Sequence, residues 1–160
     1  AHEQLRPGTH AYEIVAAGHA EPIILPLDFA KAESSDFGNI ASALESQLKR
    51  VDGIVHTAAM LGSLGPLEHQ SYDAWLSLLR VNIAAPMGLT RALVPLMSKA
   101  PDASVTFTLD DRGLAPRAYW GGYGVTKAGV AALEFQSEHL RSGPRHVRNL
   151  ARIEVRILRD

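Results

Sequence analysis

Apolar residues along the chain follow two periods, one helical and one typical of strands. They recur at helical spacing in three segments: 35–50, 71–99 and 124–141. The first of these segments has Ser35 or Asp36 as its expected N-cap. Short apolar or β-branched runs lie at 53–56 and 103–108, and the first of them predicts a strand buried on both faces. Helices that alternate with buried strands predict an α/β fold with a parallel sheet.

The two ends of the chain carry weaker patterns. Residues 1–18 predict a helix that ends at Gly18. The run at 22–28 predicts a strand at a sheet edge, because its internal Pro26 has no N–H to donate to a ladder. Near the other end, the segment 153–158 alternates apolar and polar residues like a further strand.

Composition excludes several classes of function. The 160 residues are 46% hydrophobic and 21% charged with a formal net charge of −1, as in an ordinary soluble single domain. No basic block indicates nucleic acid or a membrane surface as a partner, and no apolar run reaches the roughly 18 to 20 residues of a membrane span. The absence of cysteine excludes disulfides and thiolate chemistry, and the seven histidines show no metal-ligand spacing. We expect a cytoplasmic protein without a bound metal.

A candidate acid/base pair lies at the start of the third helical segment. Tyr123 and Lys127 are four residues apart, which places a phenol and an ammonium one turn apart on the same helical face. A positive charge beside the phenol stabilises its phenolate, which lowers the pKa of the tyrosine from its ordinary value of about 10. A surface tyrosine and lysine on an amphipathic helix are the alternative, because the spacing alone also arises by chance.

Asn82 and Pro86 interrupt the longest helical segment. Because Pro86 has no N–H, a helical backbone leaves the carbonyl of Asn82 without its i+4 partner and free to hold a water molecule. A plain proline kink beside a capping-type asparagine is the alternative interpretation of the same two residues.

The order of these features resembles the short-chain dehydrogenase/reductase family. An asparagine in a long helix, a strand at 103–108 and a Tyr-x-x-x-Lys pair follow one another, preceded by Val-Asp-Gly-Ile-Val-His-Thr-Ala-Ala at 51–59. The segment Trp-Gly-Gly-Tyr at 120–123 is similar to a bacterial subgroup of uncharacterised oxidoreductases. The resemblance covers nearly the whole chain and implies a doubly wound, Rossmann-like parallel sheet between two layers of helices.

The resemblance implies roles for the candidate residues. Tyr123 is the catalytic acid/base, Lys127 lowers its pKa and holds the cofactor ribose, and the carbonyl of Asn82 holds a water in a proton relay to the lysine. The cofactor-binding positions are Asp28 beside the adenine ring, the small residues Thr57, Ala58 and Ala59, and the Tyr123 and Lys127 pair. Capping of the following loop is the alternative role of Asp28. The implied reaction interconverts a small-molecule alcohol and a carbonyl compound with NAD or NADP, in a homodimer or homotetramer.

Two positions depart from the family's pattern. The family places a serine about 13 residues before the tyrosine to hold the substrate carbonyl, and this chain has Asp110 there. An ionised carboxylate only accepts hydrogen bonds, and its charge opposes phenolate formation at Tyr123. Thr108 has a hydroxyl but lies two residues, about 6.6 Å of extended strand, out of register. Ala59 stands where the family has glycine and lacks glycine's freedom at positive φ.

Two parts of the family's pattern are missing from the sequence. A Gly-rich phosphate-binding turn precedes the matching region in the family, and a Pro-Gly beside the nicotinamide follows it. We therefore expect residues 1–160 to form one Rossmann-like domain that is truncated at both ends, and a rearranged sheet is the alternative. Besides an active oxidoreductase, Asp110 and Ala59 leave open a catalytically degenerate homologue that serves as a binding or oligomerisation module. A serine hydrolase is disfavoured because no Gly-x-Ser-x-Gly is present.

Overall fold

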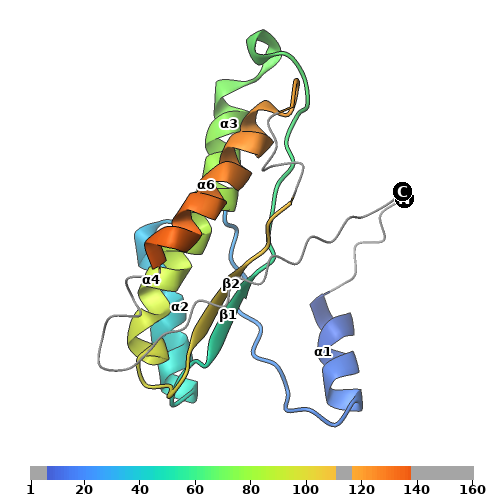
Figure 1. Cartoon of the computed structure of the whole chain (residues 1–160). Coiled ribbons are helices and arrows are strands. Elements are labelled where there is room, and N and C mark those ends of the chain that lie inside the picture. Colours follow the sequence, from blue (N-terminus) through green and yellow to red (C-terminus); the bar gives the residue numbers. More distant parts are fainter. Residues whose placement is uncertain (1–6, 111–116, 138–160) are drawn as a thin grey trace.

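Two parallel strands and the helices that cover one of their faces make up most of the computed structural model, which describes residues 7–110 and 117–137. In chain order the elements are α1 (Pro7–Ala16), α2 (Ser34–Gln47), β1 (Gly53–His56), the 3₁₀ turn η1 (Leu67–His69), α3 (Tyr72–Leu79), the π-helical turn η2 (Arg80–Ala84), α4 (Ala85–Met97), β2 (Ser104–Phe107) and α6 (Gly121–Ser137). Figure 1 shows α2, α3, α4 and α6 on one side of the strands and α1 standing apart on the other. Within the described ranges, no helix is long and apolar enough to cross a membrane.

β1 and β2 pair in parallel, with Gly53 opposite Ser104 and His56 opposite Phe107. The crossover between them is the continuous helical run of α3, η2 and α4, which the 3.6-residue spacing over 71–99 predicts. Because both strands run in the same direction, their carboxyl ends lie at one edge of the sheet, where open α/β sheets bind ligands. The α/β class and the parallel sheet expected from the sequence are confirmed.

The core lies between the two strands and the helices α4 and α6. Leu93, Leu96 and Met97 follow one another at i, i+3 and i+4, so they share one face of α4, and all three are buried with Val105 of β2. Burying each such side chain contributes about 1.5–3 kcal/mol. From α6, Val130 joins the same cluster. This packing fixes both helices against one face of the strand pair.

The opposite face of the strand pair is open. Val55 points to that face and is 65% exposed, so the prediction that β1 is buried on both faces is wrong for the described part of the chain. Side chains of a strand alternate between faces, and only the face that holds Ile54 has helices packed on it. Figure 1 shows α1 standing away from the other face.

The predicted strand at 22–28 is also wrong. This segment is irregular, and among the described residues no strand lies beside it to exchange backbone hydrogen bonds. Pro22 and Pro26 remove two of its N–H donors in any case. An extended apolar run becomes a strand only when a neighbouring strand pairs with it, which composition alone does not reveal.

Helix boundaries differ from expectation in small ways. α2 has Glu33 as its N-cap, and Asp36 sits at the third helical position, where its carboxylate accepts the Glu33 N–H at 2.9 Å in a capping box. The expected cap at Ser35 or Asp36 is therefore wrong in position, although Asp36 does serve the helix start. α6 begins at Gly121, three residues earlier than expected, whereas Gly18 follows α1 with φ 84° as predicted. The predicted strand at 153–158 lies outside the described residues.

Two helical glycines give opposite predictions for stability. A Cβ on Gly88 of α4 would lie 2.6 Å from the ring of buried Phe37, whereas a Cβ on Gly38 of α2 would meet nothing within 4 Å. We expect Gly38→Ala to raise the free energy of unfolding by about 0.5–1 kcal/mol, because alanine has the higher helix propensity. We expect Gly88→Ala to lower it by about 1–3 kcal/mol through overpacking. Urea unfolding of both variants measures the difference, and equal shifts in the two would show that α2 does not pack against α4 at Gly88.

Candidate active site

The site begins where the two strands end. Thr108 directly follows β2 and is tied to the end of β1, because its N–H and its hydroxyl both donate to the carbonyl of His56, at 3.2 and 2.9 Å. Its own carbonyl accepts a hydrogen bond from Lys127 Nζ at 3.0 Å. The Thr108 hydroxyl is thus engaged with backbone and does not replace the family's serine, in agreement with its register.

Tyr123 and Lys127 lie on one face of α6, next to this strand end. They are 8% and 5% exposed, and the ammonium is 5.6 Å from the centroid of the phenol ring. Burial lowers the pKa of the Lys127 ammonium below its usual value, and the attraction of the Asp110 carboxylate opposes part of that shift. The predicted proximity of phenol and ammonium is observed, and the pair is buried, so the alternative of a surface tyrosine and lysine is wrong.

Asp110 contacts the phenol directly. Tyr123 Oη donates a hydrogen bond to Asp110 Oδ2 at 2.9 Å, which is the juxtaposition that the resemblance to the family implies. A carboxylate that accepts this bond favours the neutral phenol over the phenolate. The strand end at 108–110 therefore holds both groups of the pair, the lysine through a carbonyl and the tyrosine through a carboxylate.

Asn82 lies in the π-helical turn η2 and is buried. Its Oδ1 accepts the N–H of Met60 at 2.7 Å, and its Nδ2 donates to the carbonyl of Met60 at 2.8 Å and to Thr126 Oγ1 at 2.9 Å. Thr126 in turn donates to the carbonyl of Tyr123 at 2.8 Å. Sequence reasoning missed Met60 and Thr126. The position of Thr126, between the tyrosine and the lysine, is the signal that was available.

The helix stays helical through Asn82 and Pro86, as the relay interpretation requires. Instead of a plain proline kink, η2 is a π-helical turn, in which the Ala85 N–H bonds to the carbonyl of Arg80, five residues back rather than four. Pro86 has no N–H for the carbonyl of Asn82. Single π-turns inside α-helices occur often at functional sites.

The loop after β1 offers small exposed residues beside the site. Thr57, Ala58 and Ala59 are all exposed. Among the described residues, Tyr119 is the non-glycine residue with positive φ, at 71°, so Ala59 adopts an ordinary backbone conformation. The expected conflict between alanine and a positive φ at this position is absent. The loop leaves room for the backbone to approach a ligand closely.

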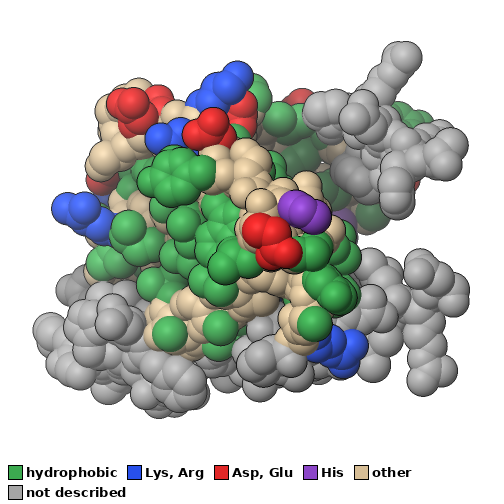
Figure 2. Space-filling view, turned by 90° about the horizontal axis from the view of Figure 1, so that it is seen from above, with side chains coloured by type: hydrophobic (Ala, Val, Ile, Leu, Met, Phe, Trp, Pro, Cys, Tyr) green, Lys and Arg blue, Asp and Glu red, His purple; other side chains and the backbone are tan. Residues whose placement is uncertain are grey.

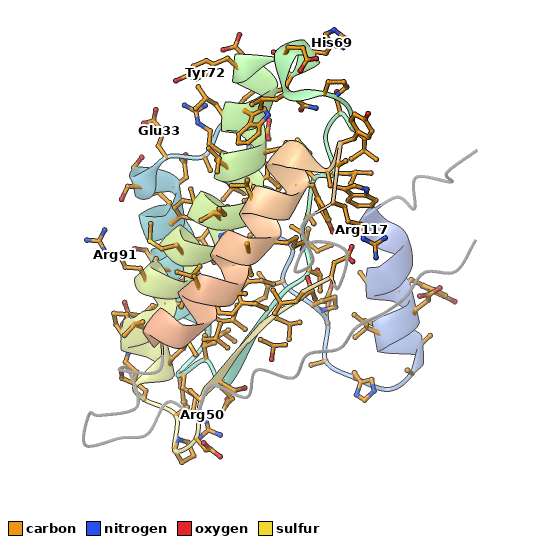
Figure 3. All side chains as sticks on the ribbon, turned by 45° about the horizontal axis from the view of Figure 1, so that its top comes forward. Glu33, Arg50, His69, Tyr72, Arg91 and Arg117 are labelled. Carbon is orange, nitrogen blue, oxygen red and sulfur yellow. The ribbon has the colours of Figure 1, made fainter. Side chains whose placement is uncertain are left out.

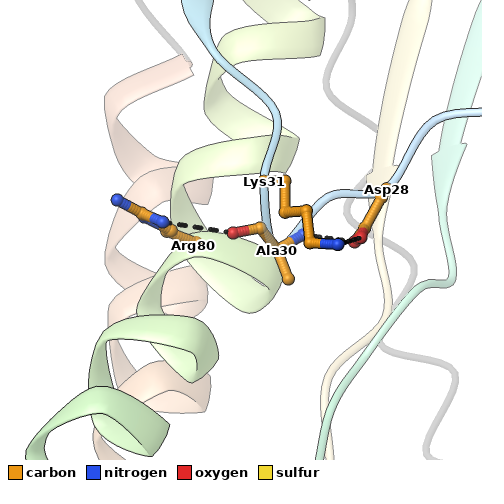
Figure 4. Close-up of polar contacts among 4 residues, drawn as sticks. All are labelled: Asp28, Ala30, Lys31 and Arg80. Carbon is orange, nitrogen blue, oxygen red and sulfur yellow. Dashed lines mark hydrogen bonds and ion pairs between the residues drawn. The ribbon is translucent and has the colours of Figure 1, made fainter.

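Asp28 lies at the turn that leads into α2, shown with its neighbours in Figure 4. Its Oδ1 accepts the N–H of Ala30 at 3.0 Å, and its Oδ2 lies 3.6 Å from Lys31 Nζ. The carbonyl of Ala30 accepts a hydrogen bond from Arg80 at 3.3 Å, which ties this turn to η2. The capping role of Asp28 is therefore observed, and its predicted contact with an adenine ring stays a prediction.

His56 is a partly buried histidine beside the site. Its Nε2 lies 2.8 Å from Thr90 Oγ1 on α4, and its ring stacks on Phe107 at a centroid distance of 5.0 Å. Burial lowers the pKa of His56 from 6.5 to about 4, so the ring is neutral at physiological pH. The ring thus links the end of β1 to α4.

Other features lie away from the site. A cavity of about 520 Å³ opens between α2 and α4 with Phe37 and Met87 in its lining, and none of the candidate site residues lines it. In Figure 3, His69, Arg91 and Glu33 point outward. Among the described residues, no cluster of three metal-ligating side chains exists.

The end of the molecule that carries the site has an apolar surface. Figure 2, seen from above that end, shows hydrophobic side chains across the middle of the face. Large exposed apolar residues of the loop after β1, the start of α3 and the entry to α6 are Leu61, Leu64, Leu67, Tyr72 and Tyr119. The loop after β1 and the entry to α6 lie together, because Gly65 N–H bonds to the carbonyl of Tyr119 at 3.0 Å.

Fold and site together define a Rossmann-like α/β protein with a buried tyrosine–lysine pair at the carboxyl edge of its sheet. The chain belongs to the short chain dehydrogenase family, whose sequence profile matches residues 4–148. The expected family resemblance is thereby confirmed.

Individual relatives agree with the family. The uncharacterized oxidoreductase YciK of Escherichia coli (strain K12) is 34% identical over 101 residues, which cover 63% of this chain and 40% of that protein. A solved short chain dehydrogenase from Pseudomonas syringae has a TM-score of 0.82 at 33% identity, over 86% of this chain and 57% of that chain. One from Escherichia coli CFT073, complexed with NADPH, has a TM-score of 0.74 at 29% identity, over 81% and 55%. The chain thus spans about half the length of these relatives.

The lowered pKa of His56 predicts a dependence of stability on pH. The folded pKa of about 4 lies below the ordinary 6.5, so protons bind the unfolded state first as the pH falls. The contribution of the neutral His56 ring to the free energy of unfolding is fully present above pH 6.5. It is lost as the pH falls from 6.5 to about 4, by up to about 3 kcal/mol. Urea unfolding at pH 7, 6 and 5 should show a smaller loss for His56→Asn than for the wild type. The exposed-residue control His69→Asn should keep the wild-type loss, and an unchanged loss in His56→Asn would contradict the prediction.

Proposed function

We propose that this protein is an NAD(P)-dependent oxidoreductase that interconverts an alcohol and a carbonyl compound. The observation that carries the proposal is the buried pair of Tyr123 and Lys127 at the carboxyl ends of two parallel strands, in a chain of the short chain dehydrogenase family. The neighbour complexed with NADPH supports the choice of cofactor class.

The residues present fit the nicotinamide end of such a cofactor. Thr57, Ala58 and Ala59 are exposed at the strand edge and have small side chains, which permits close approach of a flat ring and its ribose. Lys127 has three N–H donors and uses one on the Thr108 carbonyl, so it can also hold ribose hydroxyls. When bound, the cofactor exchanges a hydride with the carbonyl carbon.

The chain's own residues handle the proton. In reduction, Tyr123 gives its phenolic proton to the carbonyl oxygen, and the buried Lys127 ammonium stabilises the phenolate that remains. The carbonyl of Asn82, which lacks an i+4 donor at Pro86, holds a water that returns a proton toward the lysine. In oxidation the same residues act in reverse, with the phenolate as base.

Asp110 restrains this chemistry. Its carboxylate accepts a hydrogen bond from the hydroxyl whose proton Tyr123 must give to the substrate, and an ionised carboxylate offers no donor to the carbonyl oxygen. The alternative function, a catalytically degenerate homologue that binds or oligomerises, rests on this contact. The assays below separate the two.

The assembly is a homodimer or homotetramer built on α4 and α6. α6 has two apolar stripes, of which Val130 lies in the core while Val125 and Ala128 are exposed, and Met87 is exposed on α4. An apolar helical face of this kind fits the same face of a second copy across a two-fold axis. Sedimentation equilibrium of the full-length protein tests this, and a monomer at micromolar concentration would rule it out.

The decisive test is cofactor binding and turnover by the full-length protein. We expect saturable binding of NADH or NADPH and reduction of some member of a panel of aldehydes and ketones. Tyr123→Phe removes only the hydroxyl, so it should lower turnover by about a hundredfold or more while cofactor binding persists. Binding of neither cofactor, or turnover that survives in Tyr123→Phe, would overturn the proposal.

Neutralising Asp110 should make the phenol more acidic and the enzyme faster at neutral pH. We expect the negative charge of Asp110, and the hydrogen bond that it accepts from the phenol, to disfavour the phenolate of Tyr123. The ultraviolet titration of Asp110→Asn should therefore show the Tyr123 phenol ionising at lower pH than in the wild type, with Tyr123→Phe to assign the signal. Asp73→Asn, which removes the same charge at the exposed start of α3, is the matched control. Identical curves for Asp110→Asn and wild type would mean that Asp110 does not act on Tyr123.

A further inference from the structure

Thr126 occupies the contact between α6 and the π-helical turn. It is 0% exposed, and its hydroxyl makes two hydrogen bonds, to the carbonyl of Tyr123 at 2.8 Å and with Asn82 Nδ2 at 2.9 Å. A hydroxyl has one proton, and the Tyr123 carbonyl takes it, because a carbonyl cannot donate. The contact with Asn82 must therefore use a lone pair of the threonine oxygen. The direction of both bonds is fixed.

The Asn82 amide is fully committed in the same network. Its oxygen accepts the N–H of Met60, and its two N–H groups go to the carbonyl of Met60 and to Thr126. If the amide were flipped, its NH₂ group would face the Met60 N–H, and two donors would meet. Only one orientation of the amide therefore satisfies the contacts. Three segments distant in sequence are joined at this point: the loop after β1, the turn η2 and the first turns of α6.

We propose that Thr126 is a positioning residue, which sets the place of α6 relative to the Asn82 turn and to the strand end; this rests on the proposed function. Tyr123 and Lys127 lie three residues before it and one residue after it, so a shift of α6 at Thr126 moves both against Asn82 and Asp110. Without the hydroxyl, one N–H of Asn82 is left buried with no acceptor in this network, and the amide must turn or α6 must move.

Two substitutions separate this role from simple packing. Thr126→Val keeps the size and the branched shape but removes the hydroxyl, whereas Thr126→Ser keeps the hydroxyl and loses a methyl group. A residue that only fills space is better replaced by valine than by serine. A positioning residue that acts through its oxygen is better replaced by serine.

The test uses the full-length protein and two readouts. In Thr126→Val we expect kcat to fall by at least tenfold with little change in the KM for cofactor, and the ultraviolet titration of the Tyr123 phenol to move by half a pH unit or more. Thr126→Ser should restore both to within about threefold and 0.2 unit of the wild type. A valine variant that matches the wild type, or a serine variant that is as impaired as valine, overturns the proposal.

The outcomes also distinguish this inference from the proposed function. If the wild-type protein has no turnover, the proposed function fails, while the phenol titration of the three proteins still decides whether Thr126 positions Tyr123. If Thr126→Val does not fold, Thr126→Ala removes the same hydroxyl without placing a methyl group against the Asn82 amide. The same serine-over-alanine order is then expected in the titration, and the reverse order overturns the proposal.

Discussion

The parallel register of β1 and β2 determines where every candidate catalytic group lies. Thr108 extends that pairing one residue past β2, because both its N–H and its hydroxyl bond to the carbonyl of His56. Its own carbonyl is thereby fixed beside α6 and holds the ammonium of Lys127. A slip of one residue would reverse the faces of β2 and bury Thr106 in place of Val105 and Phe107. The same pairing register therefore determines both which side chains of β2 enter the core and where the Thr108 carbonyl lies in the site.

Asp110 acts on both members of the pair, in opposite senses. By accepting a hydrogen bond from the phenol O–H of Tyr123 it favours the neutral phenol, and by attracting the ammonium it offsets part of the effect of burial, which lowers the pKa of Lys127. Burial is the larger of the two effects on the lysine, so its pKa stays below the usual value. The carboxylate thus favours the charged lysine and disfavours the charged tyrosine. Charge on Lys127 helps catalysis only when the phenol can ionise beside it.

Much of the fold follows from periodicity, and the misses have physical causes. The helices, β1 and β2 were predictable, because apolar spacing encodes them, whereas the contact of Asp110 with Tyr123 was expected from the resemblance to the family. The strand at 22–28 and the double burial of β1 were not predictable, since both depend on neighbours that lie elsewhere in space. The role of Met60 also escaped, because a backbone group carries no sequence pattern. Thr126 stands visibly between Tyr123 and Lys127 in the sequence, but its hydrogen bond with Asn82 depends on the fold.

The backbone departs from regular geometry on two segments that flank the site. η2 widens the helix at Asn82, and Tyr119 adopts φ 71° just before α6, where its carbonyl accepts the N–H of Gly65. A non-glycine residue in that region costs about 1–3 kcal/mol and persists only when its surroundings impose it. The apolar core at Val105 and Met97 needs neither distortion to bury its side chains. The distortions lie instead where the loop after β1, η2 and the start of α6 meet around Tyr123.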